Sequence, residues 1–307
     1  MEMRQTFSFE MDKYMAQNEN IVLLNADLAK PNGLSEISEK YPERCINVGV
    51  AEQNMAGIAA GMSSYGFIPF IFTFTPFATR RICDQIAVSI AYAGQNVKIV
   101  GTDPGISAEY NGGTHMSVED IGILRSIPNM VIFEPVDNSQ LKKALVQILN
   151  FDKPLYIRMF RKELPDVFSD DYNFDLFKAD IIKEGKDVTI ICSGIMVQEV
   201  LEANKKLSDW GINAEIINIH TIKPIDEDTI IKSAAKTKHV ITAENHNIVG
   251  GLGSAVSEVL SQRCPTILKC IGIKDSFGQV GKMPYLKQEY NMDSRSIVSA
   301  VLEILKR

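Results

Sequence analysis

Short apolar runs alternate with longer segments of helical periodicity, and this alternation constrains the fold more than any other feature of the chain. Runs expected to form buried strands lie at residues 21–26, 45–48, 68–73, 97–102, 130–134 and 155–158. Helical segments lie at residues 4–18, 51–64, 76–93 and 137–150, with a short helix expected from Val118. Strands that alternate with helices in this way predict βαβ units, and therefore a mainly parallel sheet with helices on both faces.

The alternation stops at residues 162–180, which are acidic and show neither the strand period nor the helix period. It restarts with strands expected at 188–192, 214–219, 239–244 and 266–272, and helices at 196–209, 226–235, 251–263 and 294–306. We therefore predict two parallel-sheet α/β sandwich domains, at residues 1–165 and 181–307, joined by a linker at residues 166–180.

The composition is that of an ordinary globular protein with an acidic surface. Apolar residues make up 45% of the chain, charged residues 23%, and the net charge is −6. The negative balance argues against a nucleic-acid partner and requires a local cationic cluster for any anionic substrate. The longest apolar run, residues 66–77, is too short to cross a membrane. The five cysteines lack metal-ligand spacing and no signal peptide is present, so we expect reduced thiols, no metal site on this chain and a cytoplasmic location.

The helix expected at residues 51–64 is small or apolar nearly all round, which predicts that it is buried. Glu52 falls in its first turn, where backbone N–H groups favour a carboxylate. The simpler interpretation is that Glu52 only complements the helix terminus. Its place on an otherwise uncharged helix, on one face with Ala56 and Ala60, indicates instead a carboxylate that meets a flat ligand or another subunit.

Three phenylalanines surround the end of the strand expected at residues 68–73. Phe72 alternates with Phe74 as on one face of a strand, which usually means a place in the core. Phe74 and Phe77 flank Pro76 at the strand-to-helix turn, however, and ligands of open parallel sheets bind outside the carboxyl ends of the strands. These two rings are therefore candidates for a stacking platform.

His115 ends a glycine-rich loop that begins near Gly105 and precedes a helix. A single loop histidine is more often solvated than catalytic. The small neighbours Gly112, Gly113 and Thr114 leave room around it, which suits contact with a small polar substrate.

Two cationic clusters could hold an anion: Arg80 with Arg81, and Arg158 with Arg161. The second cluster follows a predicted strand, so both guanidinium groups are expected at the carboxyl edge of the sheet, where they could bind a phosphate. The alternative is a solvated basic patch that balances the acidic linker.

A rival hypothesis is an NAD-dependent dehydrogenase, because the sequence from Gly251 to Val256 has the pattern G-x-G-x-x-V after a strand and before a helix. That fingerprint requires a tight strand-to-helix turn, whereas about five residues separate the strand from the first glycine. Too few residues follow the motif to form the second half of a dinucleotide-binding domain. A glycine-rich helix start packed close to the sheet is the better interpretation.

Taken together, these residues resemble the transketolase family, and specifically the carboxyl-terminal half of a split transketolase. The matching motifs are Ala26-Asp27-Leu28, Asn47-Val48-Gly49-Val50-Ala51-Glu52-Gln53-Asn54-Met55, Thr73-Phe74 with Phe77, Gly112-Gly113-Thr114-His115 with Glu119-Asp120, Leu124-Arg125 with Ile127-Pro128-Asn129-Met130, and Arg161. They cover nearly all of residues 4–165, and the second domain looks like the carboxyl-terminal domain of the family.

The resemblance implies a subunit of a thiamine-diphosphate-dependent transketolase, which transfers a two-carbon ketol unit between sugars or sugar phosphates. Glu52 would then bind N1′ of the cofactor's aminopyrimidine and promote the imino tautomer, whose nitrogen takes the proton from thiazolium C2. Phe74 and Phe77 would line the same ring, and His115 would contact substrate hydroxyls. Arg158 and Arg161 would bind the anionic end of the substrate.

Several positions depart from the pattern of the family. Asp103 aligns with a second histidine of many members, Tyr110-Asn111 with a common Glu-Asp pair, and Pro31 with a serine that contacts phosphate. These departures concern the usual sugar-phosphate specificity and leave the cofactor chemistry in place. Arg4 and Arg81 join Arg158 and Arg161 as further possible anion ligands.

The family also uses Gly-Asp-Gly and a later Asn to hold Mg²⁺ and the diphosphate, and no Gly-Asp-Gly occurs in this sequence. The resemblance therefore implies a separate diphosphate-binding N-terminal subunit that supplies the Mg²⁺ ligands, in an α2β2 assembly. Two alternatives share the cofactor: a 2-oxoacid dehydrogenase β chain, and an enzyme like deoxyxylulose-phosphate synthase. A non-catalytic partner subunit is a different class of protein, which the position of Glu52 argues against.

Overall fold

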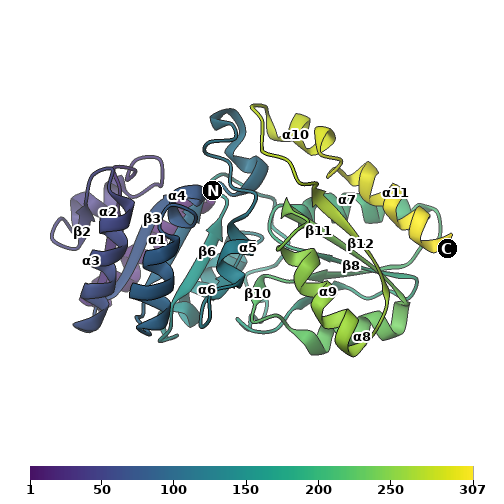
Figure 1. Cartoon of the computed structure of the whole chain (residues 1–307), viewed down its shortest axis with the longest axis horizontal. Coiled ribbons are helices and arrows are strands. Elements are labelled where there is room, and N and C mark those ends of the chain that lie inside the picture. Colours follow the sequence, from purple (N-terminus) through teal and green to yellow (C-terminus); the bar gives the residue numbers. More distant parts are fainter. Residues whose placement is uncertain (307) are drawn as a thin grey trace. The chain divides into compact units, whose positions relative to one another are not determined.

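The computed structural model describes residues 1–306, which form two compact units (Figure 1). The first unit comprises Met1–Pro104 and Ile123–Phe174, and the second comprises Gly105–Gly122 and Asp175–Arg307. The loop that carries His115 therefore belongs to the second unit, although it interrupts the sequence of the first. The domain boundaries expected at residues 165 and 181 stay a prediction.

The first unit is built on a parallel sheet in which neighbouring strands follow the order β5-β6-β4-β3-β1-β2. Most of its strand residues are buried, as expected for a parallel sheet that is covered on both faces. The strands are β1 (Ile21–Asn25), β2 (Cys45–Asn47), β3 (Ile68–Phe74), β4 (Lys98–Thr102), β5 (Val131–Phe133) and β6 (Leu155–Met159).

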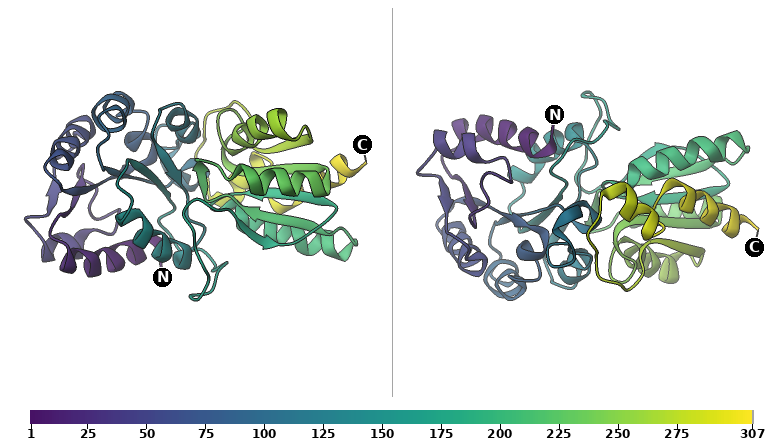
Figure 2. Two further views of the ribbon diagram at one scale, coloured as in Figure 1. Left: turned by 90° about the horizontal axis from the view of Figure 1, so that it is seen from below. Right: turned by 90° about the horizontal axis from the view of Figure 1, so that it is seen from above.

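Helices cover both faces of this sheet (Figure 2). Helix α1 packs against α6 on one face, and α3 packs against the π-helix η1 on the other. The helices in this part of the chain are α1 (Met3–Gln17), α2 (Ser35–Lys40), α3 (Glu52–Ser64), α4 (Thr75–Ala78), η1 (Gln85–Tyr92), α5 (Asp120–Arg125) and α6 (Asn138–Leu149).

The single helix expected at residues 76–93 is wrong in detail. Helix α4 ends at Ala78, because Thr79 adopts φ −131° and ψ −79°, outside the helical region. The chain then turns before η1 begins at Gln85. The break places Arg80 and Arg81 in a turn rather than on a helix. The segment that follows, η1, is a π-helix, and π-helical segments are frequent near functional sites.

The second unit has a sheet of order β12-β11-β8-β9-β7, parallel except for β7, which is antiparallel to β9. The strands of this sheet are β7 (Asp180–Lys183), β8 (Val188–Cys192), β9 (Ala214–Asn218), β11 (His239–Asn247) and β12 (Ile267–Ile273). The short strand β10 (Thr221–Lys223) does not belong to it. The helices of the second unit are η2 (Gly105–Asn111), α7 (Met196–Asp209), α8 (Glu227–Thr237), α9 (Leu252–Arg263), α10 (Met283–Glu289) and α11 (Ser294–Leu305). Helices α7 and α11 pack together on one face and α8 and α9 on the other (Figure 2).

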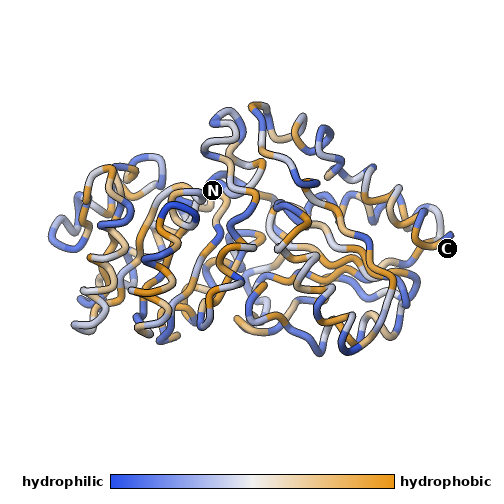
Figure 3. The backbone as a smooth tube through the Cα atoms, in the orientation of Figure 1, coloured by the Kyte–Doolittle hydropathy of each residue, from blue (hydrophilic) through white to orange (hydrophobic). Residues whose placement is uncertain are grey.

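The prediction of two mainly parallel α/β sandwich domains is confirmed. Many strand residues of both sheets are hydrophobic (Figure 3), as expected for strands that are covered on both faces. Within residues 1–306, no helix combines the length and the apolar character that crossing a membrane requires.

Candidate active site

Glu52 begins helix α3 and is buried, with 4% of its surface exposed. The chain reaches this position through a turn in which Gly49 has φ +74°, a conformation that favours glycine. The side-chain carbonyl of Asn47 holds the turn by accepting hydrogen bonds from the N–H groups of Gly49 (3.0 Å) and Asp27 (2.9 Å). A carboxylate is thus held at the first turn of a small-residue helix, as the sequence predicts. The helix is buried on one face only, because Gly57 and Gly61 are exposed in this chain.

The guanidinium of Arg81 brings the Glu52 carboxylate and the Phe77 ring together. Arg81 Nη1 donates a hydrogen bond of 2.8 Å to Glu52 Oε1, and Arg81 Cζ lies 3.8 Å from the centroid of the Phe77 ring. The carboxylate accepts no other hydrogen bond within the described residues. The sequence marks Arg81 as one of two adjacent cations and as a possible anion ligand, and it does not indicate this contact.

Phe74 and Phe77 form a half-buried aromatic pair at the carboxyl end of β3. Their ring centroids lie 6.3 Å apart with an interplanar angle of 51°. Thr75 anchors the turn between them, since its hydroxyl donates a hydrogen bond of 2.9 Å to the carbonyl oxygen of Thr102. Phe72, by contrast, packs edge-on against Phe7 in the core, so alternation along the strand separates the platform from the core.

Arg161 lies beside the same platform, with its Cζ 4.9 Å from the centroid of the Phe74 ring. Its guanidinium pairs with the buried carboxylate of Asp103, through Nε at 2.8 Å and also through Nη2. Its Nη1 donates to the carbonyl oxygen of Pro31 at 2.9 Å, and Arg4 Nη1 donates to the same oxygen at 2.8 Å. The positive charge of Arg161 is therefore neutralised by Asp103 in this structure.

Arg158 does not share that environment. Its side chain is fully buried and pairs with Glu134 Oε1 at 2.5 Å. A buried guanidinium without its carboxylate would be strongly destabilising, so this pair belongs to the interior. The geometry does not support the expected substrate contact for Arg158, because this side chain is buried and already paired with Glu134.

His115 lies in the second unit, at the end of the glycine-rich loop, and Thr114 Oγ1 is 2.9 Å from its Nδ1. The loop packs tightly against the segment that leads into α10. A Cβ atom on Gly113 would lie 2.6 Å from the carbonyl oxygen of Gly278, and a Cβ on Gly278 would lie 2.0 Å from Met116 Sδ. Glycine is therefore required at Gly113, where the close atom belongs to the backbone, and contacts across more than a hundred residues of sequence hold the His115 loop in place.

The glycine-rich start of α9 is closed to a dinucleotide phosphate. The buried carboxylate of Glu244 accepts hydrogen bonds from the backbone N–H groups of Leu252 (2.6 Å) and Gly253 (2.8 Å). A Cβ on Gly251 would lie 1.9 Å from Glu244 Oε2, which explains the glycine at this position. An internal anion thus occupies the helix terminus that a dinucleotide would need, so the geometry does not support the dehydrogenase hypothesis.

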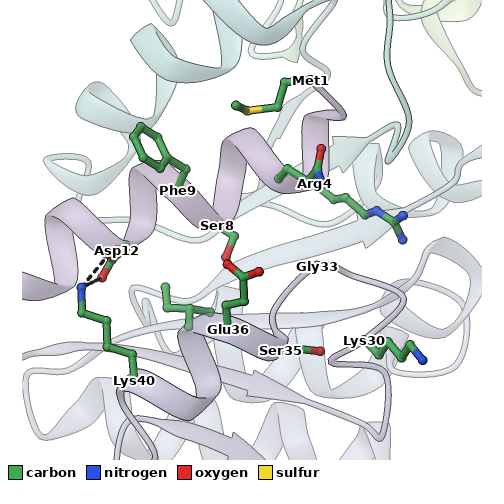
Figure 4. A pocket seen from close by; sticks show the side chains of 12 residues that line it. Met1, Arg4, Ser8, Phe9, Asp12, Lys30, Gly33, Ser35, Glu36 and Lys40 are labelled. Atoms are coloured by element: carbon green, nitrogen blue, oxygen red, sulfur yellow. Dashed lines mark hydrogen bonds and ion pairs between the residues drawn. The ribbon is translucent and has the colours of Figure 1, made fainter.

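A cavity of about 510 Å³ lies between α1 and α2 (Figure 4). Arg4, Lys30 and Lys40 line it together with the acidic residues Asp12 and Glu36. Lys40 is paired with Asp12 at 2.6 Å, and Arg4 is paired at 2.7 Å with Glu2, outside the lining. With its charges mixed and largely paired, this cavity does not form a dedicated anion site.

Two family models match the chain. Residues 1–167 match the transketolase pyrimidine-binding domain, and residues 177–297 match the transketolase C-terminal domain. These ranges contain all the candidate site residues described above.

Individual relatives agree with this match. The 6-deoxy-6-sulfo-D-fructose transketolase subunit SqwH of Clostridium sp. (strain MSTE9) is 48% identical over 99% of this chain and 95% of that protein. The chain covers only 47% of a 33% identical relative, the 1-deoxy-D-xylulose-5-phosphate synthase of Pelotomaculum thermopropionicum.

A solved structure described as a split gene transketolase, inactive beta4 tetramer, superposes with a TM-score of 0.91 at 39% identity, over 100% of this chain and 98% of that one. The fold, the order of the motifs and these matches agree. The chain belongs to the transketolase family and corresponds to the pyrimidine-binding and C-terminal domains of a split transketolase.

Proposed function

We propose that this chain is the pyrimidine-binding subunit of a thiamine-diphosphate-dependent transketolase, which transfers two-carbon ketol units between sugars or sugar phosphates. The observation that carries the proposal is the shared contact of Glu52 and Phe77 with one planar guanidinium. A flat group that stacks on Phe77 and donates a hydrogen bond to Glu52 is already accommodated there. The aminopyrimidine of thiamine diphosphate is such a group, so the residues present fit this cofactor.

Each candidate residue then has a defined task. Glu52 holds the proton at N1′ of the aminopyrimidine, and Phe74 and Phe77 stack against the ring and exclude water from it. His115, oriented through Nδ1 by Thr114, exchanges a proton with a substrate hydroxyl. When bound, thiamine diphosphate supplies the electron sink for cleavage of the ketose carbon–carbon bond.

The partner is a second subunit that holds the diphosphate and Mg²⁺, docked on the face formed by α3 and η1. Among residues 1–306, apart from the adjoining backbone of α3 itself, a Cβ added to Gly57 or Gly61 would meet no atom within 4 Å. Tyr65 and Tyr92, at the ends of α3 and η1, are 88% and 87% exposed. Exposed aromatic side chains beside a helix that permits close backbone approach are typical of a large subunit interface, and we propose an α2β2 assembly.

The five free thiols are those of a protein from a reducing compartment, and we place this assembly in the cytoplasm.

Reconstitution tests the proposed function. The chain alone should bind thiamine diphosphate weakly in titration calorimetry and catalyse no ketol transfer. A separate subunit bearing Gly-Asp-Gly and a later Asn should restore both, and chelation of Mg²⁺ should abolish both again. Tight Mg²⁺-dependent binding by the chain alone would contradict the proposal. Decarboxylation of pyruvate without ketol transfer would favour the activity named for the 1-deoxy-D-xylulose-5-phosphate synthase relative.

We further propose that Arg161 binds an anionic substrate end, and that Asp103 weakens this binding. One relative is named for 6-deoxy-6-sulfo-D-fructose and others for apulose-4-phosphate, so the panel of substrates should include sulfonate-ended and phosphate-ended ketoses. Arg161→Ala should raise KM for these ketoses by about tenfold or more, because a hydrogen bond to a charged group contributes about 1.5–3 kcal/mol.

Asp103→Asn should lower KM for the sulfonate-ended and phosphate-ended ketoses, because it removes the negative charge that neutralises Arg161. Asparagine also tolerates the positive φ of +53° at this position. A ketose with a neutral end is the control, and its KM should not change in either variant. Equal effects on neutral and anionic ketoses would exclude anion recognition as the role of Arg161.

A further inference from the structure

Arg81 uses the same two groups that the proposed cofactor site requires. Its Nη1 donates to Glu52 Oε1 at 2.8 Å, and its Cζ lies over the Phe77 ring, 3.8 Å from the ring centroid. Guanidinium and aminopyrimidine are both flat, both carry N–H donors and both stack on aromatic faces. Two flat groups cannot lie on the same face of the Phe77 ring together, so the aminopyrimidine can take this face only when Arg81 leaves it.

The surroundings of Arg81 explain why the contact forms in the cofactor-free chain. The Glu52 side chain is 5% exposed, and a buried carboxylate without a partner is strongly unfavourable. The Arg81 side chain remains 42% exposed, so it can return to water at little cost. The turn that carries it lies close to α3, since the Gln53 amide donates a hydrogen bond of 3.3 Å to the Arg81 carbonyl oxygen.

We propose that Arg81 is a placeholder in the pyrimidine site. In the cofactor-free chain it compensates the charge of Glu52 and covers the face of Phe77, so that both groups keep their places. Binding of the cofactor displaces the guanidinium into solvent. This inference rests on the proposed function, and it adds a competing group inside the protein that lowers the affinity for the cofactor.

Calorimetric titration of the reconstituted, cofactor-free assembly with thiamine diphosphate and Mg²⁺ tests the proposal. Arg81→Ala should bind the cofactor about tenfold more tightly than the wild type, equivalent to about 1.4 kcal/mol. Arg80→Ala is the matched control, because it removes the same charge from the neighbouring position, and its affinity should stay at the wild-type value. Arg81→Lys keeps the charge without the planar stack and should fall between the wild type and Arg81→Ala.

Thermal melting gives a second readout that does not depend on activity. Without cofactor, the Arg81→Ala assembly should melt at a lower temperature than the Arg80→Ala assembly. With saturating cofactor, the two should melt at the same temperature, because a placeholder stabilises only the cofactor-free state.

The possible outcomes separate this proposal from the proposed function. Equal affinity of the Arg81→Ala and Arg80→Ala assemblies would overturn the placeholder. Weaker binding by Arg81→Ala would also overturn it and would make Arg81 a direct ligand of the cofactor. If the wild-type assembly takes up no thiamine diphosphate at all, the proposed function falls, and the placeholder falls with it.

Discussion

Glu52→Ala should lower C2–H exchange of bound thiamine diphosphate, and with it turnover, by about 10²- to 10⁴-fold while the fold stays intact. That range is the usual loss when a positioned proton-transfer group is removed. Glu52 is the buried carboxylate at the platform, and Arg81 is its only hydrogen-bonding partner among residues 1–306. The measurement is deuterium exchange at C2 in the reconstituted assembly, followed by NMR after acid quenching.

Glu36 offers the matched control for Glu52. It is also an acidic residue in the first turn of a helix, α2, but it is exposed. If Glu52 only complemented a helix terminus, both alanine variants would lose about 0.3–1 kcal/mol of stability and neither would change the exchange rate. Wild-type exchange in Glu52→Ala would therefore exclude the catalytic role, and a large loss in Glu36→Ala would show that the assay reports on folding.

Gly57→Leu should abolish reconstitution with the diphosphate-binding subunit without weakening the chain itself. The added side chain points into space that this chain leaves open. Replacing a helix-interior glycine by a good helix former should stabilise the isolated chain by about 0.5–1 kcal/mol. At an interface that requires close backbone approach, the same side chain should keep the subunits apart. The variant is therefore expected to be more stable and inactive at once.

Two effects are measured separately. Light scattering with the partner and ketol-transfer activity measure assembly, and denaturant unfolding measures the stability of the isolated chain. Ser208→Leu is the control, because Ser208 is an exposed position on helix α7 of the second unit. It should assemble and turn over normally. A Gly57→Leu chain that assembles with full activity would place the partner on another face.

Local periodicity predicted most of the architecture because strands buried on both faces read as apolar runs. Periodicity did not predict features that depend on only a few residues. The break after Ala78 depends on one non-helical residue, Thr79, which has no signature in the sequence. Strand β7 is a half-exposed antiparallel edge strand of four residues, too short and too mixed for a strand pattern, and it begins at Asp180, the last residue interpreted as linker.

The sequence also predicts which residues are candidates for the site, but it does not predict which charged residues pair with one another. The first-turn position of Glu52 and the turn carrying Phe74 and Phe77 follow from local spacing. The partner of Arg161 is Asp103, which lies 58 positions earlier in the chain, and that of Arg158 is Glu134. Both arginines looked alike in the sequence, because a residue's neighbours across a sheet depend on strand order rather than on spacing.

The sequence alone therefore determined two parallel α/β domains, a carboxylate at the start of a small-residue helix and an aromatic pair at a strand end. Each is a property of one segment, set by backbone preference and hydrophobic period. Three further features are visible only in the folded chain: Arg81 contacts both Glu52 and Phe77, Arg158 is buried, and Glu244 closes the start of α9. These depend on charge compensation between segments far apart in the chain, because a carboxylate or guanidinium removed from water takes whichever partner the fold brings within reach.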